Sequence, residues 1–132
     1  MAIERINPAD INTPVGYTHV VKATGGTTVY IAGQVAADAS GNVVGAGDLA
    51  AQTRQVLTNL QTALAAAGGG FGDVVKMTTF IVNYTPEMRA AYRAVRGEFI
   101  TGDTPASTLV GVQALAAPDY LIEIEAVAVI DG

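Results

Sequence analysis

Two glutamates near the end of the chain are the side chains best placed for acid–base chemistry. Glu123 and Glu125 lie in the segment LIEIEAVAVI, residues 121–130, which has the composition of a strand. Because side chains alternate along a strand, both carboxylates are expected on one face, roughly 6.5–7 Å apart along the backbone. A carboxylate at the mouth of an apolar contact can hold a water molecule and move protons. The alternative is a structural role on a solvated face.

A histidine and two hydroxyls are the other candidates. His19 is the only histidine, and its imidazole could act as a general base near neutral pH, although the sequence shows no partner that would fix it. Ser107 and Thr108 stand at the start of the strand-like segment PASTLVGV. No Gly-x-Ser-x-Gly segment and no lysine in a Schiff-base context accompanies them, so nothing marks a covalent nucleophile.

The charge and composition narrow the function further. With 7 basic and 12 acidic residues the net charge is −5, so a phosphate backbone is repelled and nucleic acid is an unfavourable partner. The chain has no cysteine and one histidine, so we expect no metal site, and nothing indicates a cofactor. The N-terminus lacks the pattern of a secretion signal and no window reaches the ~18 apolar residues of a membrane helix. We therefore expect a cytoplasmic protein without membrane contact.

The length and the first turn signal set the organisation of the chain. At 132 residues, half of them hydrophobic, the sequence is expected to form one domain spanning residues 1–132. Two β-rich runs within residues 17–36 are joined at Gly25 and Gly26, a pair that accepts the positive φ angles of a tight turn. These runs predict a β-hairpin.

Two helices and three further strands follow. Asp48 is predicted to cap the first helix, which ends in the segment AAAGGG. Thr85 is expected to cap the second helix, with Pro86 in the first helical position and Gly102 after its end. The strands are predicted in DVVKMTTFIVN, ASTLVGV and LIEIEAVAVI.

The resulting order, ββαβαββ, predicts an α+β domain in which both helices cover one face of a mixed sheet. In the last strand one face carries isoleucines and alanines, whereas the other still carries Leu121, Val127 and Val129 beside the glutamates. Two helices of this size do not wrap both faces of a sheet. The second face is therefore expected to be covered by self-association.

Four segments follow one another along the chain: VYIAGQVA, LAAQTRQVLTNLQTALAAAG, DVVKMTTFIVN, and PASTLVGV with LIEIEAVAVI. Together they cover nearly the whole chain, and in this order they resemble the Rid family of reactive-intermediate deaminases, also called YjgF. The resemblance implies a chorismate mutase-like fold and a homotrimer with a small-molecule site in each cleft between subunits. It also implies hydrolysis of an enamine or imine to a ketone and ammonia without a cofactor.

The family's site residues are carried over by position. The resemblance places the glutamate that handles the catalytic water at Glu123, and the backbone part of the site at Gly33 and Gln34. The aromatic residue of the site falls on Tyr17 by its neighbouring glycine, or on His19 by counting back from Gly33. Both alternatives stay open at this point.

Ser107 is where the chain departs from the family pattern. Typical members have Pro-x-Arg-Ser or Pro-x-Arg-Thr, and that arginine holds the substrate carboxylate through a bidentate pair. Here Ser107 occupies the arginine position and Thr108 follows it, so the chain resembles a divergent subgroup that lacks the arginine. The residues Tyr17, His19, Gly33, Gln34, Ser107 and Thr108 are the expected substrate-binding set.

The missing arginine shapes the functional expectation. The sequence favours a deaminase-like hydrolase whose substrate differs from the usual amino-acid-derived imines. The alternative is a trimer that binds a small ligand without turnover. The ribonuclease activity for which some relatives are named has the least support, because the chain is acidic and has no histidine pair.

Overall fold

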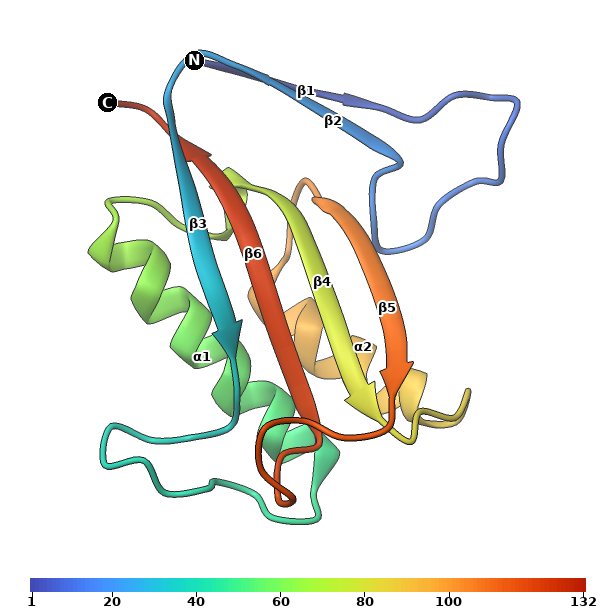
Figure 1. Ribbon diagram of the computed structural model, residues 1–132. Helices are drawn as coiled ribbons and strands as arrows, with labels where there is room; N and C mark the ends of the chain where they lie inside the picture. Colours follow the sequence, from blue (N-terminus) through green and yellow to red (C-terminus); the bar gives the residue numbers. More distant parts are fainter.

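A four-stranded sheet with two helices on one face forms the body of the molecule (Figure 1). The computed structural model describes all 132 residues. The strands of the main sheet, in spatial order, are β3 (Thr27–Gln34), β6 (Ile122–Ile130), β4 (Val74–Val82) and β5 (Ala106–Val112). The helices are α1 (Leu49–Ala66) and α2 (Met88–Phe99), and a short 3-10 turn, η1 (Phe71–Asp73), precedes β4. The predicted α+β class is confirmed.

β6 lies between β3 and β4 and pairs antiparallel with both, while β4 and β5 pair in parallel. Its side chains alternate as the sequence predicts. The five that face the helices are all buried, and they are Ile122, Ile124, Ala126, Ala128 and Ile130. This apolar row gives α1 a surface on which to pack.

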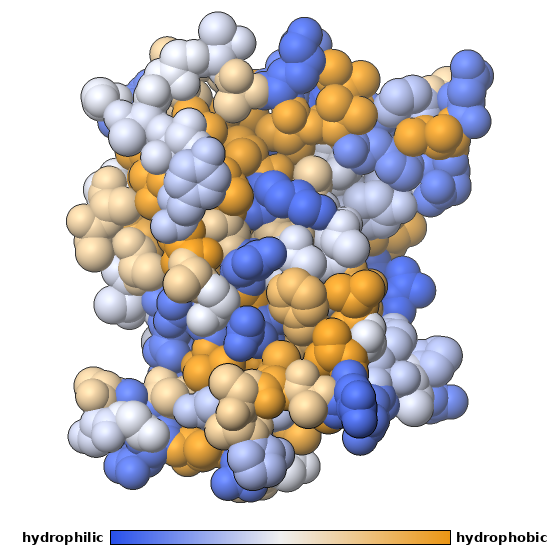
Figure 2. Space-filling model, in the orientation of Figure 1, coloured by the Kyte–Doolittle hydropathy of each residue, from blue (hydrophilic) through white to orange (hydrophobic).

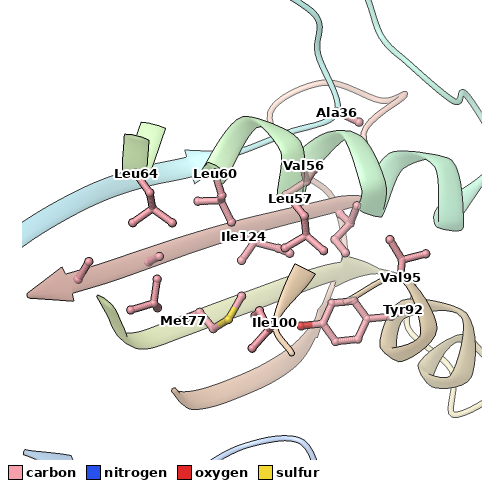
Figure 3. Packing of buried hydrophobic residues seen from close by; sticks show 14 of the residues in the cluster. Ala36, Val56, Leu57, Leu60, Leu64, Met77, Tyr92, Val95, Ile100 and Ile124 are labelled. Atoms are coloured by element: carbon pink, nitrogen blue, oxygen red, sulfur yellow. The ribbon is translucent and has the colours of Figure 1, made fainter. Parts of the chain in front are cut away.

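The core lies between the sheet and the helices (Figure 3). Leu57, Leu60 and Leu64 lie on one face of α1 and are completely buried against it. Tyr92 of α2 is also buried, and its hydroxyl lies 2.8 Å from the hydroxyl of Thr79 on β4. Because that bond satisfies both hydroxyls, it anchors α2 to the sheet.

The ends of the helices follow the predictions in part. The Asp48 carboxylate accepts a hydrogen bond from the Ala51 amide at 3.0 Å, and so it caps α1 as predicted. α2 begins at Met88, later than predicted, with Glu87 at the N-cap and no side-chain cap. The expected cap, Thr85, contributes its carbonyl instead, which accepts from the Met88 amide in a preceding turn. Pro86 lies in that turn and not in the helix.

The predicted hairpin is wrong. Gly25 and Gly26 do adopt positive φ angles, 75° and 73°, but the two runs that they join do not pair with each other. β2 (Val20–Thr24) pairs with β1 (Ala2–Ile6), a strand that no sequence pattern predicted, and β3 pairs with β6. β1 and β2 form a separate two-stranded sheet beyond the end of the main one (Figure 1).

The sheet face away from the helices carries no covering element (Figure 1). We call it the open face, and its residues are Tyr30, Lys76, Thr78, Phe80, Thr108, Val110, Glu123, Glu125 and Val127. Figure 2 shows this side as apolar surface interrupted by hydrophilic side chains. Tyr30 is 80% exposed and Val110 40%, so large apolar groups meet solvent here in a single chain. No helix is long and apolar enough to cross a membrane.

A buried glutamine of α1 holds the segment that leads into β6. Gln52 is completely buried, and its side-chain amide donates to the carbonyls of Asp119 at 2.8 Å and Gly45 at 3.3 Å. Its carbonyl oxygen accepts from the Leu121 amide at 2.8 Å. One side chain thus holds the residues that lead into the strand carrying both glutamates.

Replacing Gln52 by alanine is expected to lower the free energy of unfolding by about 2–4 kcal/mol, because several buried backbone groups lose their partners. Denaturant unfolding measures the change. Gln61→Ala is the matched control, since Gln61 is exposed on the same helix. Equal effects of the two substitutions would contradict the role given to Gln52.

Candidate functional site

Glu123 and Gly33 are in direct contact. The pairing of β3 with β6 is interrupted by a bulge between Ile31 and Gln34, and Gly33 lies in that bulge. A Cβ built on Gly33 would stand 2.4 Å from Oε2 of Glu123, which is too close for any side chain. The absence of a side chain at Gly33 is therefore what lets the carboxylate lie over the backbone of β3.

The Glu123 carboxylate has no hydrogen-bond or ion-pair partner within the chain. It is half-buried on the open face, where it lies in register with Phe80 of β4. Glu125, one pleat along on the same face, is exposed and pairs in register with Thr78. The expectation that both carboxylates share one face is confirmed, and Glu123 is the one that the fold partly shields from solvent.

Ser107 faces the opposite way. In the parallel pairing of β4 and β5 it lies in register with Met77, a core residue, so its side chain points toward α2. There it lines a cavity of about 310 Å³, which we call the helix-side cavity; its walls include Tyr17, Tyr84, Arg89, Arg93 and Arg96. Thr108, the next residue, lies on the open face, where it accepts a hydrogen bond from Lys76 Nζ at 2.6 Å. One pocket of one chain does not take both hydroxyls.

The structure distinguishes between Tyr17 and His19, the two candidates for the aromatic residue of the site. Tyr17 lines the helix-side cavity with Ser107, whereas His19 does not. His19 packs edge-on against the Tyr17 ring, with the ring centroids 5.3 Å apart, and its Nε2 lies 2.6 Å from the Asn12 carbonyl oxygen. Tyr17 is therefore the residue that shares a cavity with Ser107, and His19 supports its ring.

The candidate residues thus form two groups on opposite faces of the sheet. Glu123 and Gly33 belong to the open face, and Ser107 and Tyr17 belong to the helix-side cavity. Two inter-strand spacings and three residues of strand separate the backbones of Glu123 and Ser107, a distance of roughly 14 Å. A small molecule in one chain does not reach both groups.

Three arginines line the helix-side cavity, and the sequence alone leaves open whether Arg54, Arg89, Arg93 or Arg96 reaches a cleft in place of the missing arginine. Arg89, Arg93 and Arg96 recur at the spacing of one helix face, but only the walls of the cavity show that this face meets Ser107. Arg54, by contrast, pairs with Glu98 at 2.5 Å on the outer surface of the helices.

The protonation of Tyr92 and the capacity to bind a metal ion complete the description of the site. Burial raises the pKa of the Tyr92 phenol, while the nearby charges of Arg96 and Arg93 act in the opposite direction. The hydroxyl therefore stays protonated beside the arginines at neutral pH. No three histidine, aspartate or glutamate side chains gather closely enough to hold a metal ion.

Comparison with known proteins places the chain among related sequences. The family model described as endoribonuclease L-PSP matches residues 8–130. A RutC family protein of Pyrococcus horikoshii is 39% identical over 118 residues, covering 87% of this chain and 88% of the relative. A RutC family protein of Synechocystis is 37% identical over 133 residues, with 98% of each chain covered.

Solved structures decide the assignment. YyfB of Yersinia pestis, described as a member of the conserved Rid protein family, is 44% identical and superposes with a TM-score of 0.93 over 98% of this chain and all of the other. RidA of an Antarctic Psychrobacter is 30% identical, with a TM-score of 0.72 over 96% and 99% of the two chains. The chain belongs to the Rid family. Its fold is accordingly the chorismate mutase-like fold that the resemblance implied.

Within this Rid chain, the positions carried over from the family pattern fall into the two groups described above. Gly33 and Glu123 are in contact, and the side-chain amide of Gln34 donates back to the Ala32 carbonyl at 3.1 Å, within the bulge. Ser107, onto which the resemblance carries the arginine position, lines the helix-side cavity. The three arginines of α2 therefore lie on the same side of the sheet as Ser107.

The contact between Gly33 and Glu123 can be tested by substitution. Gly33→Ala is expected to push the carboxylate aside and to lower the free energy of unfolding by about 1–3 kcal/mol, the usual cost of overpacking. Removing the carboxylate first, with Glu123→Ala, should relieve most of that cost. A double-mutant cycle measured by denaturant unfolding gives the coupling between the two positions.

Gly102→Ala is the matched control, because a Cβ at Gly102 meets nothing within 4 Å and its φ is not positive. It should change stability little in either background. Additive effects of Gly33→Ala and Glu123→Ala would show that the two residues do not touch in solution.

Proposed function

We propose that the chain assembles as a homotrimer and hydrolyses an enamine or imine in each cleft between subunits. The observation that carries this proposal is the half-buried Glu123 carboxylate, which lies against Gly33 without a partner of its own. It stands on an open face that leaves Tyr30 and Val110 in solvent. A second copy packed on that face would bury the apolar groups and bring its own residues near the carboxylate.

The separation of the two groups supports an intersubunit site. Glu123 and Ser107 are roughly 14 Å apart along the sheet and face opposite ways, so neither group forms a complete site by itself. In a closed ring each subunit presents one face to one neighbour and a different surface to the other. The open face of one copy would then meet the helix-side cavity region of the next.

The chemistry needs only water and one carboxylate. The imine reacts in its protonated form, the iminium: as water adds to the carbon, Glu123 accepts one proton of the water and a neutral tetrahedral carbinolamine forms. Glu123 then returns that proton to the nitrogen, the carbon–nitrogen bond breaks with release of ammonia, and the hydroxyl proton of the carbinolamine passes to Glu123 as the ketone forms. An enamine gives the same iminium when its β-carbon takes a proton from solvent. Holding water and imine carbon in contact contributes further to the rate.

The substrate is proposed to differ from the usual amino-acid-derived imines, because Ser107 stands where the family arginine would hold their carboxylate. A hydroxyl offers one donor and no charge, and loss of a charge-assisted pair in a cleft costs about 2–5 kcal/mol of binding. Ribonuclease activity is not proposed. The only histidine packs against Tyr17 and the net charge is −5.

The homotrimer has a direct test. Light scattering at micromolar concentration should return about three times the chain mass of 13.5 kDa. Replacing Tyr30, which is 80% exposed on the open face, by aspartate should lower that mass if this face is the contact. A monodisperse monomer of the unaltered chain would contradict both the assembly and the shared site.

The role of Glu123 is tested with Glu125 as the matched control on the same strand face. Ammonia release is measured with imines generated in situ from a panel of amino acids and amines. Glu123→Gln should reduce turnover by about 10²–10⁴-fold, the contribution of a positioned acid–base group, and leave the assembly intact. Glu125→Gln should change it little.

Two outcomes would change the assignment. Loss of turnover in Glu125→Gln but not in Glu123→Gln would show that Glu125, and not Glu123, is the acid–base group. If the trimer binds small molecules but releases no ammonia from any of them, the ligand-binding alternative replaces the hydrolase.

A further inference from the structure

Three arginines of α2 form a cationic face with no acidic partner. Arg89, Arg93 and Arg96 are spaced four and three residues apart, so their side chains lie on one side of the helix. Like charges at this spacing repel each other and destabilise a helix. The ion pairs of the chain involve Arg5, Lys22, Arg54 and the N-terminus, and none involves these three.

The three guanidinium groups enter the helix-side cavity at different depths. Arg89 is exposed, Arg93 is half-buried and Arg96 is only 8% exposed. All three line the cavity, and no aspartate or glutamate does. The cavity therefore holds three positive charges, from its mouth to its base, in a protein whose net charge is −5.

The hydrogen bonds of the arginines leave that charge uncompensated. Arg93 Nη2 donates to the Val15 carbonyl at 2.6 Å and Arg96 Nη1 to the Gly16 carbonyl at 2.5 Å. Arg96 Nη2 also donates weakly to the Met77 sulfur at 3.9 Å. All three acceptors are neutral, and Arg89 makes no side-chain hydrogen bond. Arg96 Nε is the one buried side-chain polar atom without any partner. A buried guanidinium without a counter-charge is costly, so the site is electrostatically incomplete.

The walls indicate what kind of anion completes it. Tyr17, Tyr84 and Tyr92 present aromatic surface, and Leu109 adds an aliphatic wall beside Ser107. An inorganic anion would use the arginines and leave these rings in contact with water. A small organic acid uses both, because a planar carboxylate matches the guanidinium fork and its carbon skeleton packs against the rings.

We propose that the helix-side cavity binds the carboxylate of a small organic acid through Arg93 and Arg96, with Arg89 at its mouth. Ser107 is then neutral because the cations come from α2: an arginine at position 107 would add a fourth guanidinium to the three already present. On this proposal, the residues that anchor the carboxylate lie on α2 instead of β5.

The binding claim stands without the proposed hydrolysis, and it deepens the proposed function if both hold. A carboxylate held from α2 places the rest of the ligand differently from one held from β5. The substrate of the hydrolase would then be an imine or enamine that carries a carboxylate, with a different distance between that group and the reactive carbon. This agrees with the proposal that the substrate is not one of the usual amino-acid-derived imines.

Calorimetry at fixed ionic strength tests the site with benzoate and 2-oxobutanoate as probes, and with sulfate and inorganic phosphate as the competing anions. The unaltered chain should bind at least one of the two carboxylates saturably. Arg93→Gln should weaken that binding by about tenfold or more, and Arg89→Gln by a smaller factor. Arg89 is exposed and makes no side-chain hydrogen bond or ion pair, so its substitution keeps the test valid if Arg93→Gln does not fold.

Arg54→Gln is the matched control, because it removes the same charge from an exposed site on α1. Its effect on binding should stay within about twofold, since exposed charges are screened. Light scattering of each variant without ligand checks whether the arginines hold a neighbouring copy instead.

Four results would overturn the proposal: no saturable binding of either carboxylate, equal weakening by Arg54→Gln, tighter binding of sulfate or phosphate than of benzoate, or loss of assembly in Arg89→Gln and Arg93→Gln. The last result would assign the arginines to carboxylates of the partner subunit. Binding is measured without turnover. A chain that binds the carboxylate but hydrolyses no imine would therefore contradict the proposed function and leave the carboxylate site standing.

Discussion

The alternation of side chains along β6 is the constraint on which the rest of the structure depends. β6 pairs with strands on both of its sides, so its register sets the register of the main sheet. One of its faces supplies the row of isoleucines and alanines under α1, and the other carries the two glutamates. Shifting the strand by one residue would put Glu123 into the core and Ile124 into solvent. The stability of the fold and the position of the carboxylate therefore come from a single pattern.

Much of the fold could be predicted from local patterns, and the largest error came from pairing at long range. The apolar periodicity of α1 and its cap at Asp48 are local signals, and so are the alternating residues of β4 and β6. The hairpin at Gly25 and Gly26 failed for a different reason. The turn conformation was right, but β2 takes its partner from the first residues of the chain, and no local signal marks that choice.

The site was predictable as a set of positions but not as a geometry. The period of two placed Glu123 and Glu125 together, and it also separates Ser107 from Thr108, yet the sequence did not reveal which face of β5 meets a helix. That depends on the parallel register with Met77, which is settled by packing. The three arginines of α2 were visible as a helix stripe. The cavity that they line is completed by the loop that contributes Tyr17. No local sequence pattern predicts the path of that loop over α2.

The close approach of Glu123 to Gly33 also orders the substitutions that this chain can accept in the course of evolution. While position 123 is glutamate, a side chain at position 33 forces the carboxylate to move from its place over the bulge. A larger residue at position 33 is therefore better tolerated after the glutamate has shortened or gone. Homologues that lose the acid can fill the bulge, and a later return to glutamate then disfavours that side chain. The pair should therefore covary across the family, and a side chain at position 33 would mark lineages in which the carboxylate no longer occupies this place.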